Sequence, residues 1–129
     1  MRPPFLLAAF LCASGRIPLR TVRMRHDAIE NLCAMRGGPR DGALLRLTIA
    51  NARLARGEIA LAIEELREAL NFDPDYSAAW KLLGKTLATA GDMPAAIETY
   101  QVGIAAAIRR GDKQAEKEMT VFLRRLARA

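Results

Sequence analysis

The sequence has almost none of the residues on which catalytic and metal-binding sites usually depend. Its 129 residues include a single histidine, His26, and two cysteines, Cys12 and Cys33. No nearby set of Cys, Asp or Glu residues has metal-ligand spacing with His26, and Ser14 and Ser77 lack a histidine-based arrangement that would activate them. We therefore expect no metal site, no cofactor and no enzymatic activity. Two cysteines also do not predict a disulfide framework.

Aromatic residues and long apolar runs are scarce too, which narrows the classes of partner. Aromatic residues make up 5% of the chain, so few rings are present to stack on bases. The sequence contains no run of about 18 apolar residues that would span a membrane. The formal net charge is +6, but residues 1–26 hold five arginines and no acidic residue. The rest of the chain has 15 basic and 14 acidic residues, so we expect no binding to nucleic acid.

The first 23 residues have a composition of their own, and three interpretations stay open. Arg2 precedes the apolar stretch 5–13, an order that resembles a secretory signal and would make the protein secreted or periplasmic. The lack of acidic residues also resembles an organelle transit peptide. In the third interpretation translation starts at Met24 and residues 1–23 are never made. The third interpretation predicts a cytoplasmic protein.

What the sequence does contain is one pattern of small and large apolar residues, which occurs twice at an interval of 34 positions. The recurring positions pair Ile49 with Leu83, Ala50 with Gly84, Gly57 with Gly91, Glu58 with Asp92, Ala62 with Ala96, Ile63 with Ile97, Glu64 with Glu98, Leu66 with Tyr100, Ala69 with Gly103 and Leu70 with Ile104. A fixed period of this length is typical of a stacked array, in which one unit alone cannot bury its apolar face.

Within each period the apolar residues follow helical spacing. Residues 43–56 and 59–72 place apolar side chains three and four positions apart, which predicts two amphipathic helices. Glycine follows the first helix of each period, where a left-handed residue ends a helix. An acidic residue, Glu58 or Asp92, comes next and suits the exposed N–H groups at a helix start. Each period is therefore predicted to fold as a helical hairpin.

Two further features predict how the hairpins join and pack. Asp73-Pro74-Asp75 is predicted to stop one hairpin and to cap the first helix of the next. Small residues such as Ala50 and Gly84 let paired helices approach closely, beside the larger Leu66 and Tyr100. A larger residue at Gly84 is therefore expected to overpack this contact.

The two periods resemble the tetratricopeptide repeat, a helix–turn–helix unit with small and large residues at set positions. Residues 77–110 carry its pattern as Trp80, Leu83, Gly84, Leu87, Gly91, Asp92, Ala96, Tyr100 and Gly103, and residues 43–76 carry it as Ile49, Ala50, Gly57, Ala62, Leu66, Ala69 and Pro74. Arg46 departs from the pattern in place of the early Trp, and Ile108 in place of the closing Pro. The resemblance implies an all-α fold, in which stacked antiparallel hairpins form a right-handed α-solenoid.

The flanking segments extend the array in both directions. The predicted divisions are the extension 1–23 and a repeat domain 24–129, made of a half unit 24–42, units 43–76 and 77–110, and a capping helix 111–129. Residues 26–36 are predicted as the second helix of the half unit. In the capping helix, Asp112 is the predicted N-cap, and Ala115, Met119, Phe122, Leu123 and Leu126 are predicted to face inward. Arg125 is predicted to lie on the charged outer face, with Lys113, Glu116, Lys117, Arg124 and Arg128.

The resemblance also implies a concave surface that receives a peptide or a partner helix. The family's lining positions fall here on Leu47, Asn51, Leu54, Lys81, Lys85 and Met119. Asn51 and the two lysines would meet carboxylates or backbone groups of a peptide, although a solvated helix face explains the lysines equally well. The clamp by which some repeat domains hold the C-terminal carboxylate of chaperones is matched at Asn51, but not at Leu47, Leu82 or Asp112. We do not expect that activity.

Three functional hypotheses follow. The leading one is a non-catalytic adaptor that binds a protein or peptide of unknown identity in the groove. The second is a structural protein completed by self-association, possible because the missing first helix of the half unit leaves one end of the array uncapped. The third is an exported assembly factor of the cell envelope, which depends on residues 1–23.

Overall fold

The computed structural model describes residues 28–128, which fall into two units divided between Ala34 and Met35. Of the first unit, residues 28–34 are helical, within the predicted span 26–36. The interpretations of residues 1–23, the start at Met24 and the roles of Cys12 and His26 lie outside the described residues. Within the described part, no helix is both long enough and apolar enough to cross a bilayer.

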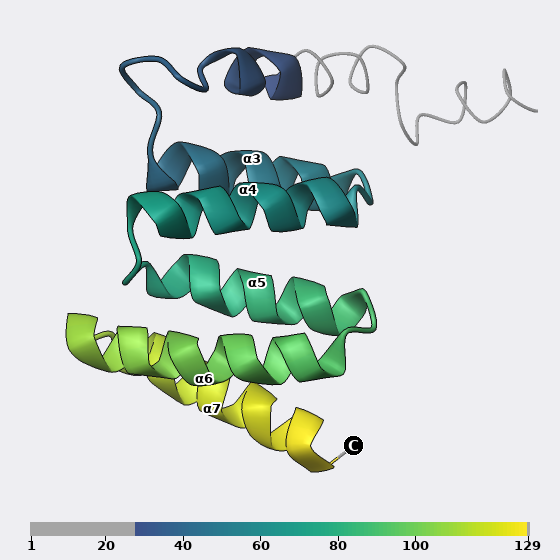
Figure 1. Ribbon diagram of the computed structural model, residues 1–129, viewed down its shortest axis with the longest axis vertical. Coiled ribbons are helices and arrows are strands. Elements are labelled where there is room, and N and C mark those ends of the chain that lie inside the picture. The colour runs from purple at the N-terminus through teal and green to yellow at the C-terminus, as the bar shows by residue number, and fades with distance from the viewer. Residues whose placement is uncertain (1–27, 129) are drawn as a thin grey trace, which may run out of the picture. The chain divides into compact units, whose positions relative to one another are not determined.

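The second unit contains the helices labelled in Figure 1. They are α3 (Ala43–Ala55), α4 (Ile59–Phe72), α5 (Ser77–Thr89), α6 (Met93–Arg110) and α7 (Lys113–Arg128). The hairpins α3–α4 and α5–α6 coincide with the two predicted repeats. The described residues contain no strand.

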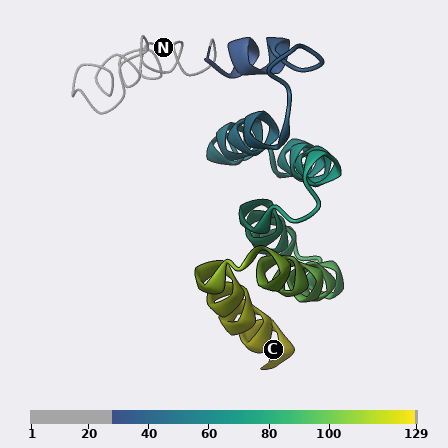
Figure 2. The same ribbon diagram turned by 90° about the vertical axis from the view of Figure 1, so that its left-hand side faces the viewer.

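Successive helices of this unit pack against one another from α3 to α7, and α5 also contacts α7. Figure 2 shows α3 and α7 on one side of the stack, α4 and α6 on the other, and α5 between them. The repeat pattern predicts that the first helix of each unit, here α3, α5 and α7, contributes to the binding surface. We call the surface formed by these three helices the inner face.

Each hairpin turns at a glycine with a positive φ, 77° at Gly57 and 89° at Gly91. This left-handed conformation costs glycine nothing and other residues about 1–2 kcal/mol. Asp92 then caps α6 by accepting a hydrogen bond from the Ala95 N–H at 3.3 Å. Glu58 was predicted to act in the same way but makes no capping bond. Its carboxylate instead pairs with Arg53 and Arg56, both at 3.2 Å.

The aspartates in the turn between the hairpins do not cap α5, contrary to the prediction. Tyr76 is the N-cap of α5, and its side chain makes no capping bond. Asp73 accepts a hydrogen bond from the Asp75 N–H at 3.2 Å, which closes an Asx turn around the proline. The two carboxylates also pair across the stack with Arg110 and Arg109 at the end of α6, at 2.6 and 2.7 Å.

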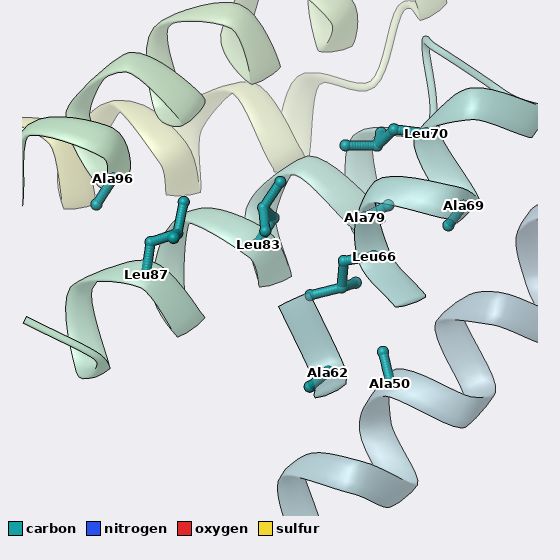
Figure 3. Close-up of a cluster of buried hydrophobic side chains, with 9 residues drawn as sticks. All are labelled: Ala50, Ala62, Leu66, Ala69, Leu70, Ala79, Leu83, Leu87 and Ala96. Atoms are coloured by element: carbon teal, nitrogen blue, oxygen red, sulfur yellow. The ribbon is translucent and has the colours of Figure 1, made fainter. Parts of the chain in front are cut away.

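The core of the stack is built from alanine and leucine. Figure 3 shows nine of these buried side chains, from α3 to α6. Leu66 is fully buried in this cluster together with Ala50, Ala62 and Ala79. A second cluster joins α6 to α7 around Tyr100 and Met119. The small alanines let neighbouring helices approach, and the leucines fill the space between them.

Two glycines in this core admit no side chain. A Cβ atom at Gly84 would lie 2.6 Å from the Tyr100 ring, which supports the expected overpacking at this position. A Cβ atom at Gly103 would lie 2.7 Å from the Met119 sulfur and 2.7 Å from the Trp80 Cβ. Both helices of the second hairpin therefore approach their neighbours at a glycine.

The junction between α6 and α7 differs from the junction between the hairpins. Since no proline follows the helix at the repeat position, α6 continues to Arg110 and ends at Gly111, whose φ is 77°. Asp112 then accepts a hydrogen bond from the Ala115 N–H at 3.1 Å, as predicted for the N-cap. This glycine–aspartate turn is the kind that joins the two helices within a hairpin. It shifts α7 relative to the repeat register.

Arg46, which replaces the early Trp of the repeat, organises a charged cluster. Its guanidinium donates two hydrogen bonds to Asp41, both at 2.9 Å, and a third to Glu65 at 3.1 Å. Arg36 reaches the other Glu65 oxygen at 2.6 Å, and the Phe72 ring lies 5.9 Å from the Arg46 guanidinium carbon. The hydrogen bonds from Arg46 hold the pKa of Asp41 well below its usual range.

Candidate functional site

Three of the predicted groove residues lie on α3. Asn51 is exposed, whereas Leu47 and Leu54 are half-buried and pack against the alanine–leucine core. Because the three residues are spaced by three and four positions, they share one face of the helix. α3 therefore presents an amide between two partly covered leucines.

Lys81 and Lys85 lie one turn apart on α5 but have different surroundings. The Lys81 ammonium pairs with Glu118 of α7 at 2.7 Å, and this hydrogen bond lowers the pKa of the Glu118 carboxyl. Beside it, the Ser77 hydroxyl donates to Asp112 at 2.6 Å, which lowers the pKa of Asp112. Lys81 thus helps to hold α7 against α5.

Lys85 is exposed and has no ion pair among the described residues. It stands at the edge of a recess of about 300 Å³ between α5 and α7. We call this the α5–α7 recess; its lining residues are Lys85, Ala88, Thr89, Tyr100, Phe122, Arg125 and Leu126. Asn51 precedes Lys85 by one repeat period, so the two residues hold equivalent positions in their hairpins.

Met119, the sixth predicted groove residue, is a core side chain. It is fully buried and lies against Gly103 and Trp80 of the second hairpin. It is therefore removed from the binding surface. Lys85, one repeat period before Met119, is exposed, whereas Met119 is buried, so α7 does not follow the register of the two hairpins.

Arg125 is the residue that the sequence pattern missed. It was predicted on the outer face, but it lines the α5–α7 recess, with its guanidinium carbon 5.9 Å from the Phe122 ring. The same shift in α7 that buries Met119 brings Arg125 to the recess. Ile108 was the available signal, because a helix without the closing proline does not end at the repeat position.

A second recess of about 370 Å³ lies beside the Arg46 cluster. Its lining combines three arginines with three glutamates: Arg36, Arg46, Arg67, Glu64, Glu65 and Glu68. Glu65 is 6% exposed and is bonded by both Arg36 and Arg46. The sequence pattern also missed this cluster. The available signal was that positions 46 and 65 hold opposite charges, Arg46 and Glu65, where the next repeat has the uncharged Trp80 and Thr99.

The chain matches the family model of the tetratricopeptide repeat over residues 47–113. It is also 48% identical over 101 residues to a TPR repeat-containing protein of Pseudomonas aeruginosa, an alignment that covers 78% of this chain and 96% of that protein. The chain belongs to the tetratricopeptide repeat family. Both findings confirm the resemblance drawn from the sequence.

Similar solved structures, one of them a tetratricopeptide repeat domain, confirm the fold. A protein of Bordetella parapertussis with a known solution structure is 48% identical, has a TM-score of 0.67, and is matched over 78% of this chain and 87% of that chain. The Sgt2 TPR domain of Aspergillus fumigatus is 25% identical with a TM-score of 0.61, over 85% and 75% of the two chains. The predicted all-α array of stacked hairpins is thus confirmed.

Tetratricopeptide repeat domains are protein-interaction modules, with extended surfaces that contact other proteins. The chain is therefore a protein-binding scaffold in general terms. Among the described residues, no group of three or more His, Cys, Asp or Glu side chains is placed to hold a metal ion.

Proposed function

We propose that the inner face binds an extended segment or a helix of a partner protein. The observation that carries this proposal is the pairing of exposed polar groups with partly covered apolar ones on that face. Asn51 and Lys85 repeat at equivalent positions, and Leu47, Leu54 and Phe122 are half-buried near them. Polar groups that fix orientation beside apolar contact area are typical of peptide-binding grooves.

The contrast between the two lysines refines the proposal. Lys81 already neutralises Glu118, so its charge is less available to a ligand. Lys85 has no such partner in the described part of the chain, so an incoming carboxylate would not have to displace an acid from it. We therefore assign ligand contacts to Asn51 and Lys85, and a role in holding α7 to Lys81.

Site-specific photo-cross-linking tests this proposal. A photoreactive phenylalanine analogue replaces Asn51 in one version of the full chain and Gln101, which is exposed on α6, in a matched control. After irradiation in the protein's own cells, cross-linked products are identified by mass spectrometry. We expect a partner that is joined at position 51 and absent from position 101.

Two other outcomes would contradict the groove. Equal products from both positions would move the contact away from the inner face. A product made only of two copies of this chain, together with a mass that rises with concentration, would favour self-association instead.

A further inference from the structure

The α5–α7 recess has a mostly apolar interior. Phe122 and Leu126 are half-buried, and Tyr100, which also lines the recess, is 2% exposed. The Tyr100 and Phe122 rings lie with centroids 5.8 Å apart, a spacing at which aromatic rings attract each other. The volume, about 300 Å³, is at the lower limit for sites that enclose a drug-sized molecule. The recess therefore suits an apolar side chain of a bound peptide.

The edge of the recess is positively charged. Lys85 and Arg125 are the charged residues that line it, and no acidic residue does. Neither cation is in an ion pair among the described residues, although Arg125 lies over the Phe122 ring. After Glu118, α7 contains no acidic residue but three arginines, Arg124, Arg125 and Arg128. The two cations are thus left without local neutralisation.

We propose that the α5–α7 recess anchors an acidic peptide segment, which inserts one apolar side chain between Phe122 and Leu126 and places flanking carboxylates on Lys85 and Arg125. This inference rests on the proposed function, in which the inner face binds a partner segment. It adds the chemistry of that segment and the point where it is held. Guanidinium and ammonium groups beside an apolar recess can form charge-assisted hydrogen bonds with carboxylates.

The same features disfavour a nucleic acid as the ligand. Base recognition on single strands needs exposed rings on which bases stack. Tyr100 is covered, and Phe122 is half-buried beneath Arg125. The apolar side chains inside the recess, such as Phe122 and Leu126, also have no hydrogen-bond donor or charge with which to bind a phosphate group. Charge complementarity therefore favours a peptide that is both acidic and apolar.

A peptide array on the purified full chain tests the inference. Each peptide carries one leucine, phenylalanine or serine, flanked on both sides by glutamates, glutamines or lysines. We expect glutamate-flanked leucine or phenylalanine peptides to bind at least tenfold more tightly than either the glutamine-flanked or the serine-centred peptides. The preference for glutamate should weaken as the salt concentration rises.

Two double variants locate the effect. Lys85→Glu/Arg125→Glu is expected to abolish the preference for glutamate. Lys117→Glu/Arg124→Glu makes the same change in net charge at exposed positions that do not line the recess, and should leave the preference intact. Circular dichroism of both variants checks that the helices are retained.

The outcomes separate this inference from the proposed function. Peptides that bind equally with glutamate, glutamine or lysine flanks would overturn the acidic specificity, while leaving cross-linking at position 51 free to support groove binding. Loss of the glutamate preference in both double variants would overturn the recess as its location. Equal binding of a poly-deoxythymidine strand, also lost on Lys85→Glu/Arg125→Glu, would overturn the choice of a peptide.

Discussion

In this protein the size of one residue is matched to the size of its neighbour in the next helix. The first hairpin combines Ala50 with Leu66, and the second combines Gly84 with the larger Tyr100. A bulkier side chain on one helix is therefore accompanied by a smaller one on the other. Since interiors are close-packed, a change in only one member of a pair has to displace its neighbours.

Gly84→Ala is accordingly expected to lower the free energy of unfolding by at most about 2 kcal/mol. Overpacking costs about 1–3 kcal/mol, and the better helix propensity of alanine returns about 1 kcal/mol. Urea denaturation measures the change. Adding Tyr100→Leu recreates the Ala50–Leu66 pair and should recover part of the loss. Gly42→Ser, where a Cβ atom meets nothing within 4 Å, is the control, and an equal loss there would contradict the explanation.

Met119→Ala is expected to cost about 2–4 kcal/mol of unfolding free energy, because it removes a fully buried side chain from a packed cluster. Val121 on the same helix is 43% exposed. Val121→Ala should therefore lower the free energy of unfolding by less than about 1 kcal/mol. Thermal unfolding of both variants makes the comparison. If Met119→Ala lowered the free energy of unfolding no more than Val121→Ala does, the assignment of Met119 to the core would be contradicted.

At the scale of the helices, α7 determines which surface is presented on the inner face. It is held to α5 by two polar contacts, Ser77 with Asp112 and Lys81 with Glu118. Together with the apolar cluster that joins α6 to α7, these contacts hold α7 beside the recess that Arg125 lines. The binding surface and the attachment of the last helix therefore depend on each other.

Lys81→Glu and Lys85→Glu should separate attachment from binding. Lys81→Glu places a carboxylate against Glu118, so we expect a lower urea midpoint than in the unchanged protein. Lys85→Glu has no acidic partner to repel within the described residues and should leave the midpoint almost unchanged while weakening peptide binding. Equal urea midpoints for the two variants would contradict the division of roles.

The helices themselves could be predicted because short-range signals specify them. Gly57, Gly91 and Pro74 mark where helices end, and the period of 34 residues transfers each signal from one hairpin to the other. The position of α7 could not be transferred in this way. It depends on how far α6 continues beyond the repeat, and that follows from the absence of a proline rather than from a residue that is present.

The charged contacts of the candidate site were harder to predict for a related reason. Arg46 and Glu65 are 19 positions apart, and their pairing is visible only once α3 and α4 lie side by side. Asn51 and Lys85 are exposed, and their position on the helix follows from the repeat pattern; their contact with a ligand remains a prediction. Whether a lysine is paired, as Lys81 is, depends on a helix more than thirty positions away.

For the whole molecule, acid is expected to weaken the fold through carboxylates whose pKa values are lowered. Arg46 lowers the pKa of Asp41, Ser77 that of Asp112, and Lys81 that of Glu118. The ordinary values are 3.8 for Asp and 4.5 for Glu, so the unfolded chain binds protons at a higher pH than the folded one. The stabilisation is complete above these values and is lost as the pH falls through the lower folded-state values.

Urea midpoints measured between pH 7 and pH 2 test this expectation. The midpoint should be nearly constant near neutrality and should decrease below about pH 5. Asp112→Asn removes one of the three groups and should flatten the decrease. A midpoint that increases on acidification would contradict the assignment.

The glycine turn between α6 and α7 has a consequence for how this array can change in length. A duplicated copy of residues 43–76 inserted after residue 76 would end in its own Asp73-Pro74-Asp75 turn and would present a second α4 to the following α5. A copy added after residue 110 would instead separate Met119 from Gly103, where α7 now packs. Gain of a repeat by gene duplication is therefore compatible with the middle of the chain, whereas the end of α6 is committed to α7.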